Sequence, residues 1–228
     1  MLIVLLLIDG VGYEYLAKDS FWYRNSMCIE NSVPTITCPN WLTILSGLRP
    51  IDHGVLKNED FRPKDYVFPK TTIFDDVPDS MLISDWKVFH KVSKKPKFMH
   101  ANIWKAIKNL KICDRDQLIV LNYMHADNIG HKYGWNSKEY HKILRYIDQE
   151  TQKLYEKLIR CSKPFVLLGV SDHGGDEHKD HENEHDKNTR NVPLLFISNM
   201  SIKKPSIKSN TEIRGYMKKI INRHSVTS

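Results

Sequence analysis

Three apolar segments of the chain each lead into aspartate residues, and two of them also into histidine. The segments are residues 2–8, 118–123 and 164–170, and the polar residues that follow them are Asp9, Asp127, His131, Asp172 and His173. Aspartate and histidine without clustered cysteine are typical ligands of a catalytic Zn²⁺ or Mn²⁺ rather than of a structural zinc. Closely packed carboxylates raise one another's pKa unless cations neutralise them, so this set predicts a pair of divalent metal ions.

The apolar segments have the composition of β-strands that are covered on both faces of a sheet. In open α/β sheets, ligands bind at the carboxyl ends of the strands, and the polar residues follow those ends. A single aspartate after a strand is most often a helix cap or a turn former. Its recurrence at three strand ends predicts that the side chains converge. Two metal ions about 4 Å apart would clamp the attacking and leaving oxygens of a phosphoryl displacement.

A histidine-rich segment follows Gly175 and contains His178, His181 and His185 among many charged residues. Most of this segment has the composition of a solvated loop. One of its three histidines is nevertheless a candidate for the missing ligand of the second metal ion.

Residues 33–41 contain a threonine that is placed for chemistry. Pro39 opens an apolar run that ends at Ser46 and Gly47, which predicts a short helix with Thr37 near its N-cap. Unpaired backbone N–H groups and the helix dipole make such a helix start an anion site. Thr37 therefore either caps the helix or contributes its hydroxyl to the chemistry at the strand ends.

The elements that must position these residues are predicted from hydrophobic periodicity and capping residues. Further strands are expected at residues 27–30, 81–84 and 192–197. Helices are expected at residues 13–18, 72–77, 101–110, 137–159 and 211–223, and residues 57–72 are expected to form a loop. Strands that alternate with helices predict an α/β sandwich. We expect one domain over residues 1–228, with 57–115 as a less regular connecting region.

Composition limits the classes of function. The 228 residues carry a net charge of +7, which suits an anionic substrate or a nucleic acid and does not distinguish them. Four scattered cysteines without a CxxC pair favour a reduced protein over a disulfide scaffold. Residues 1–8 lack a basic n-region and a cleavage site, and no stretch is long enough to span a membrane. We therefore expect an intracellular, cytoplasmic protein without a membrane span.

Several short motifs occur in the order of a known family. They are Asp9-Gly10, Pro34-Thr35-Ile36-Thr37-Cys38-Pro39-Asn40, Ser46-Gly47-Leu48-Arg49-Pro50 with His53-Gly54, Asp127 with Gly130-His131-Lys132-Tyr133-Gly134, and Ser171-Asp172-His173-Gly174. From residue 2 to about residue 197 the chain resembles the type I phosphodiesterase/nucleotide pyrophosphatase branch of the alkaline phosphatase superfamily. The resemblance implies an alkaline-phosphatase-like fold, in which helices cover both faces of a central, mostly parallel sheet.

The resemblance also implies roles for individual residues. One zinc ion would be held by Asp9, Thr37, Asp172 and His173, and the other by Asp127, His131 and a distal histidine. The distal histidine is expected to be His181, with His185 as the second choice and His178 as the third. Thr37 would be the nucleophile, activated by its metal ion, and would form a phospho-threonine. Asn40 matches the family residue that donates to a phosphoryl oxygen.

The predicted function is that of a metal-dependent phosphodiesterase for small phosphodiesters or phosphoanhydrides, nucleotides among them. The family's nucleotide-specific members carry a base-stacking aromatic residue directly after the nucleophile, and here that position is Cys38. Trp41, Tyr133 and Trp135 are the alternative stacking residues. Other functions remain open: a phosphomonoesterase or phosphotransferase, a metal-bound inactive relative, or a basic nucleic-acid-binding module. We expect no stable nucleic-acid partner.

Overall fold

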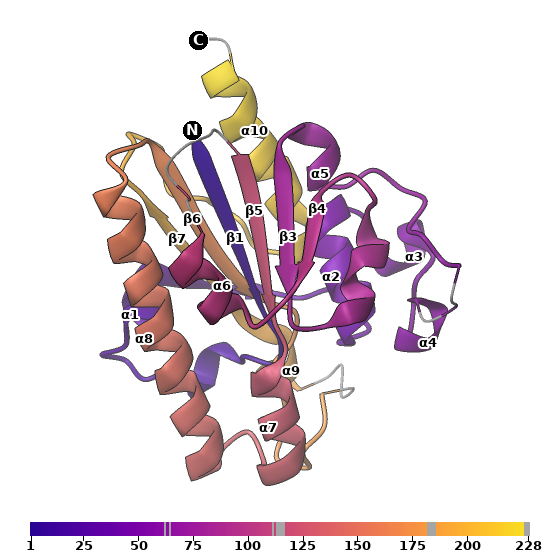
Figure 1. Ribbon diagram of the computed structural model, residues 1–228. Coiled ribbons are helices and arrows are strands. Elements are labelled where there is room, and N and C mark those ends of the chain that lie inside the picture. The colour runs from indigo at the N-terminus through magenta and orange to yellow at the C-terminus, as the bar shows by residue number, and fades with distance from the viewer. Residues whose placement is uncertain (62, 64, 111, 113–116, 182–185, 226–228) are drawn as a thin grey trace.

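The computed structural model describes the chain except residues 62, 64, 111, 113–116, 182–185 and 226–228. Within the described residues, seven strands form one sheet in the order β2-β7-β6-β1-β5-β3-β4 (Figure 1). The strands are β1 Leu2–Ile8, β2 Ser26–Glu30, β3 Ser80–Ser84, β4 Lys97–His100, β5 Gln117–Tyr123, β6 Phe165–Ser171 and β7 Asn191–Ser198. In this sheet β7 alone runs in the direction opposite to the other six strands, so the sheet is mostly parallel, as predicted.

Helices cover both faces of this sheet (Figure 1). The longer ones are α2 Thr37–Ser46, α6 Ile103–Asn109, α7 His125–Tyr133, α8 Lys138–Arg160 and α10 Ile213–Ser225. The short ones are α1 Phe21–Asn25, α3 Pro50–His53, α4 Asn58–Phe61, α5 Ile73–Asp76 and α9 Lys187–Arg190, with 3-10 turns at Tyr13–Tyr15, Lys87–Val92 and Asn210–Glu212.

The alternation of side chains along β1 divides the core into two layers. Ile3, Leu5 and Leu7 pack with residues of α2, α5 and α10 on one face. On the other face, the intervening side chains pack with α1, α6 and α8. β1 is buried along its whole length, which is why its sequence is continuously apolar.

Most predicted elements are present, and the corrections concern short ones. Ser137 caps α8 as expected, and its hydroxyl accepts a hydrogen bond from the backbone N–H of Tyr140. The prediction of a loop over residues 57–72 is wrong at α4, and the predicted helix at 13–18 is only the 3-10 turn Tyr13–Tyr15. β4 was not predicted, because this edge strand has exposed ends and only two half-buried side chains.

Two features bear on the expected compartment. Cys161 is disulfide-bonded, whereas Cys28 and Cys38 form no disulfide. The expectation of reduced cysteines is therefore wrong at Cys161, and disulfides persist mainly in oxidising compartments. None of the helices in the described residues has the length and hydropathy that a membrane span requires. The cytoplasmic location remains a prediction.

The register of the three central strands brings their carboxyl ends to one level. Ile8 at the end of β1 lies opposite Tyr123 of β5 on one side and Ser171 of β6 on the other. Gly10 follows with a φ of +73°, and a Cβ there would lie 2.6 Å from the Cα of Asp127. A glycine is therefore needed for α7 to approach the end of β1.

We expect Gly10→Ala to lower the free energy of unfolding by about 1–3 kcal/mol, because a side chain would strain the backbone and push Asp127 away. Gly215→Ala is the control: Gly215 lies in α10 with open space around it. That change should stabilise the protein by up to about 1 kcal/mol. Urea unfolding measures both, and equal effects at the two glycines would contradict the close approach.

Candidate active site

Asp9, Asp172 and His173 form the first of two ligand groups, at the adjoining ends of β1 and β6. All three side chains are fully buried. Nε2 of His173 lies 3.2 Å from a carboxylate oxygen of Asp9 and 3.4 Å from one of Asp172. One potential ligand atom from each residue lies within 4.8 Å of the other two, which is close enough for one metal ion to contact all three.

The second ligand group consists of Asp127, His131 and His181, and its ligand atoms also lie within 4.8 Å of one another. Asp127 and His131 are four residues apart on α7, so they share one face of the helix, and Nε2 of His131 lies 3.3 Å from Asp127 Oδ1. His181 reaches the group from the segment after β6. Of the two candidate distal histidines among the described residues, His178 and His181, the structure brings His181 to this group.

The two groups adjoin each other. The rings of His173 and His181 stack with a centroid distance of 3.8 Å and an angle of 16° between their planes. Asp127 Oδ1 lies 3.9 Å from Nε2 of His173, so this carboxylate faces both groups. The arrangement is a single site with two neighbouring ligand groups.

Backbone carbonyls fix the orientation of all three histidine rings. Nδ1 of His173 lies 2.8 Å from the carbonyl oxygen of Gly174. Nδ1 of His131 lies 2.9 Å from the carbonyl oxygen of Lys179, and Nδ1 of His181 lies 2.7 Å from that of Thr35. A carbonyl oxygen can only accept a hydrogen bond, so Nδ1 carries the proton in each ring. Nε2 is then left with a lone pair, as a metal ligand requires.

Unpartnered carboxylate oxygens test whether metal ions fit this site. Both oxygens of Asp9, Oδ1 of Asp127 and Oδ2 of Asp172 are buried, and none of them accepts a hydrogen bond from the described residues. Buried charge without a partner is costly, and a divalent cation would remove that cost. The Asp and His donors also suit Zn²⁺ or Mn²⁺, so the residues fit the predicted metal pair.

Burial and neighbouring charges shift the pKa values of the three aspartates. Burial, followed by the charge of Asp127, raises the pKa of Asp9 well above its ordinary value, and burial with the charge of Asp9 does the same for Asp172. For Asp127, burial also raises the pKa, but the adjoining imidazole of His131 and the other nearby histidines outweigh it, so the net pKa is lowered.

The two histidines of the second group shift in opposite directions. The adjoining carboxylate of Asp127 raises the pKa of His131. Burial, with the neighbouring His173 ring, lowers the pKa of His181 to about 4. His181 is therefore neutral at neutral pH, which is the form that binds a metal ion.

Thr37 is the first residue of α2, and Ile36 is the N-cap. Its hydroxyl oxygen lies 3.4 Å from Nε2 of His173, at the first ligand group. The hydroxyl of Thr35 instead donates to the backbone carbonyl of His181. This contact occupies Thr35 in positioning His181 and leaves Thr37 as the threonine that faces the site.

Asn40 does not have the position that its predicted role requires. Its amide nitrogen donates to the carbonyls of Pro34 and Ile36, at 2.8 and 3.2 Å, and its oxygen accepts from Asn210. Both amide hydrogens are used within the chain, so Asn40 cannot donate to a phosphoryl oxygen and the predicted role is wrong. Asn40 instead holds the segment before Thr37 in place.

Sequence reasoning missed Asn58, the first residue of α4. Its Oδ1 accepts a hydrogen bond of 2.9 Å from the backbone N–H of Cys38, which places the Asn58 amide beside Thr37. The same bond uses one donor of the first turn of α2, and Pro39 has none. The helix start is thus a poorer anion site than predicted. The sequence offered one indication of this residue, an asparagine five residues after His53, but it lies in a segment that was expected to be a loop.

The remaining predicted residues belong to neither ligand group or lie outside the described residues, although the Trp135 ring contacts that of His131 at a centroid distance of 5.0 Å. His178 has an exposed side chain next to Glu177, and His185 is not among the described residues. Trp41 and Trp135 are buried in the core and cannot stack on a base. Tyr133 is 42% exposed at the end of α7 and is the alternative that remains.

Comparison with known proteins places this geometry in a family. The family model described as type I phosphodiesterase / nucleotide pyrophosphatase matches residues 3–104 and 72–192. An uncharacterized pyrophosphatase/phosphodiesterase of Schizosaccharomyces pombe is 22% identical over 218 residues, which is 75% of this chain and 44% of that protein. The chain thus spans less than half the length of this curated relative.

Solved structures show the same fold at low identity. A murine ectonucleotide pyrophosphatase/phosphodiesterase 5, an inactive variant in complex with AMP, has 14% identity and a TM-score of 0.67, covering 97% of this chain and 94% of that one. The phosphoglycerol transferase GacH of Streptococcus pyogenes, in complex with sn-glycerol-1-phosphate, has 13% identity and a TM-score of 0.67, covering 95% and 73%. These similarities confirm the predicted alkaline-phosphatase-like fold.

The raised pKa of Asp9 leads to a pH-dependent stability of the metal-free protein. Above its ordinary pKa of 3.8, the folded state keeps a proton on Asp9 that the unfolded state has lost, so stability falls as the pH rises. Asn cannot titrate. We therefore expect the stability of the chelated wild type, relative to Asp9→Asn, to fall as the pH rises from about 4 towards neutrality.

Urea unfolding at a series of pH values in the presence of a chelator measures this difference. Addition of zinc should stabilise the wild type most at neutral pH, because metal ligands must be deprotonated. A stability difference that stays constant with pH would contradict the raised pKa of Asp9.

Proposed function

The chain belongs to the type I phosphodiesterase/nucleotide pyrophosphatase family, and on this premise we propose that it is a metal-dependent phosphodiesterase with Thr37 as its nucleophile. The observation that carries the proposal is the position of the Thr37 hydroxyl, 3.4 Å from His173 and beside two adjoining Asp/His groups. The proposed substrates are small phosphodiesters or phosphoanhydrides. The family match argues against a nucleic-acid-binding module.

We assign the metal ligands by ligand group. Asp9, Asp172 and His173, with the Thr37 hydroxyl, would hold one ion, and Asp127, His131 and His181 would hold the other. Zinc is the proposed metal and manganese the alternative, because both accept carboxylate and imidazole ligands. Bound ions would supply the positive charge that lowers the pKa of the Thr37 hydroxyl and stabilises the negative oxygens of the transition state.

The residues of the chain then divide the work of the reaction. Thr37 Oγ1, having lost its proton to solvent, attacks the phosphorus and forms a new P–O bond, and the bond to the leaving oxygen breaks. The Asn58 amide, whose oxygen accepts from the backbone N–H of Cys38, would donate to a phosphoryl oxygen. Water then hydrolyses the phospho-threonine and frees Thr37 for another turnover.

Nucleotides are one substrate class consistent with this site. The related murine protein binds AMP. Tyr133 is exposed, whereas Trp41 and Trp135 are buried, and the Tyr133 ring could stack on a base. Cys38 is buried, so the position directly after the nucleophile lines the core rather than a base pocket.

A phosphotransferase or phosphomonoesterase is the second candidate. The similarity to a phosphoglycerol transferase supports a transferase, in which an alcohol would replace water in the second step. The same residues would carry the first step in all of these reactions. Only the acceptor and the substrate's charge would differ.

We expect Thr37→Ala to lower the turnover of bis(p-nitrophenyl) phosphate by the zinc-loaded protein at least about a thousandfold, because the attacking oxygen is lost. Zinc content measured in parallel separates loss of the nucleophile from loss of metal. Retention of wild-type turnover would disprove the assignment of Thr37.

Cys38→Ala is the matched control for the nucleophile. The thiol is buried next to Thr37, and we expect this variant to keep its turnover. Mass spectrometry of acid-quenched protein should then place the phosphoryl group on Thr37. A phosphoryl group that disappears in Cys38→Ala would instead identify the thiol as the nucleophile.

We also expect a higher kcat/KM for bis(p-nitrophenyl) phosphate than for p-nitrophenyl phosphate. Within the described residues, every ion pair of Asp9, Asp127 and Asp172 is made with a histidine. In this part of the chain, no arginine or lysine is therefore paired with these carboxylates, where it could balance the second negative charge of a monoester. A clear monoester preference would favour the second candidate.

A further inference from the structure

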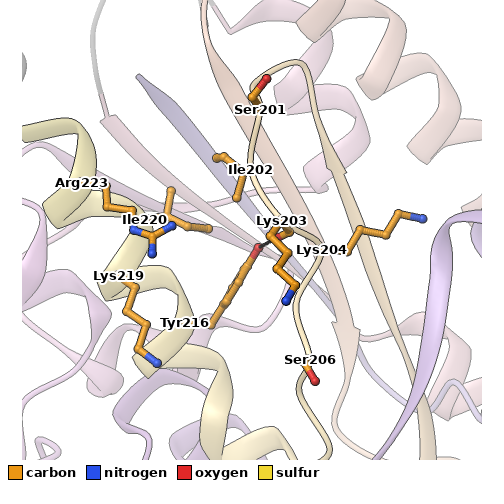
Figure 2. Close-up of a pocket in the computed structure, with 9 residues that line it drawn as sticks. All are labelled: Ser201, Ile202, Lys203, Lys204, Ser206, Tyr216, Lys219, Ile220 and Arg223. Carbon is orange, nitrogen blue, oxygen red and sulfur yellow. Dashed lines mark hydrogen bonds between the residues drawn. The ribbon is translucent and has the colours of Figure 1, made fainter.

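A second concave site lies between α10 and the segment that follows β7. It has a cavity volume of about 330 Å³. The segment contributes Ser201, Ile202, Lys203, Lys204 and Ser206, and α10 contributes Tyr216, Lys219, Ile220 and Arg223 (Figure 2). The volume is at the small end of the range for small-molecule pockets, so it suits a compact ligand rather than a macromolecule.

The contacts of Tyr216 fix the shape of this pocket. The Tyr216 hydroxyl donates a hydrogen bond of 2.9 Å to the backbone carbonyl of Lys203, which ties the segment to α10 (Figure 2). The Tyr216 ring contacts Phe196 of β7 edge-on, and Ile220 is buried in the core beneath the pocket. The floor is therefore apolar and anchored to the sheet.

Positive charge surrounds this floor. Figure 2 shows Lys219 and Arg223 on one side of the Tyr216 ring and Lys203 on the other, while Lys204 extends away. Four cationic residues and no acidic residue line the pocket. In the described part of the chain, none of these four cations forms an ion pair. By contrast, Arg214 and Lys218 of the same helix both pair with Asp76.

The pocket is separate from the candidate active site. Ser198 at the end of β7 pairs with Val166 near the start of β6, so the following segment leaves the sheet at the amino-terminal edge of the parallel strands. The ligand groups lie at the opposite edge. Figure 1 shows the end of α10 near the N-terminus of the chain and α7 at the other end of the sheet.

We propose that this pocket is a binding site for a small phosphorylated molecule with an apolar or aromatic part. Lys203, Lys219 and Arg223 would contact the phosphoryl oxygens, with the serine hydroxyls as further donors, and Tyr216 and the two isoleucines would contact the apolar part. None of the large exposed hydrophobic side chains of the described chain lines the pocket, which disfavours insertion into a membrane.

Phenylphosphonate is a suitable probe, because its P–C bond is not a target of phosphodiester hydrolysis. Methyl NMR of isoleucine-labelled full-length protein reports on the pocket itself through Ile202 and Ile220, and exposed Ile51 serves as the reference. We expect saturable shifts of the Ile202 and Ile220 signals and none for Ile51. The absence of saturable shifts in the wild type would overturn the proposal.

The matched variants reverse the same amount of charge inside and outside the pocket. Lys219→Glu with Arg223→Glu should raise the dissociation constant of phenylphosphonate at least about tenfold. Lys105→Glu with Lys108→Glu, on the exposed face of α6, should leave it unchanged. Thermal unfolding verifies that each variant is folded, and equal affinity in the two double variants would overturn the proposal.

A binding experiment with lipid vesicles distinguishes a free ligand from a lipid headgroup. Wild-type protein that binds phosphatidylserine vesicles through Lys219 and Arg223, without any response of Ile202 and Ile220 to phenylphosphonate, would overturn the small-molecule proposal in favour of an anionic surface. A response to phenylphosphonate without vesicle binding supports the proposal as stated.

Discussion

The burial of carboxylates at the end of the central strands is the constraint on which the site depends. Asp9 and Asp172 are fully buried, and three of their four oxygens have no hydrogen-bond partner in the described residues. A folded chain can tolerate this only if protons or cations neutralise the charge. The orientation of the histidine rings favours a cation, because His173 turns the lone pair of its Nε2 towards Asp9 and Asp172, and His131 turns its own towards Asp127.

The sheet and the segments around it supply this geometry with few specific contacts. Parallel pairing of β1 with β6 brings Asp9 and Asp172 to one level, and Asp127 reaches them on α7, which follows β5 and packs closely against Gly10. Two further segments complete the site. They are α2, whose first residue is Thr37, and the loop that carries His181. Thr35 links these two segments through its carbonyl and its hydroxyl.

The sequence was sufficient to predict those elements whose burial requires a continuously apolar composition. The central strands were predictable because both of their faces are covered, and the ligand groups followed from what comes after each strand. β4 was missed because an edge strand needs no apolar run, and the antiparallel direction of β7 has no local signature. The roles of Asn40 and Asn58 could not be predicted from the sequence either. They depend on the tertiary contact of α4 with the start of α2, which puts Asn58 beside Cys38, whereas the Asn40 amide is bonded to the carbonyl of Pro34.

The two faces of α10 show how charge that maintains the fold differs from charge that is free to bind. Arg214 and Lys218 are neutralised by Asp76, and Arg214 also donates to the carbonyl of Ser46, so these cations join α10 to α2 and α5. Lys219 and Arg223 form no ion pair in the described chain, and their like charges repel each other on the same side of the Tyr216 ring. Repulsion of this kind opposes folding, so an anion that entered the pocket would bind and stabilise the fold at once.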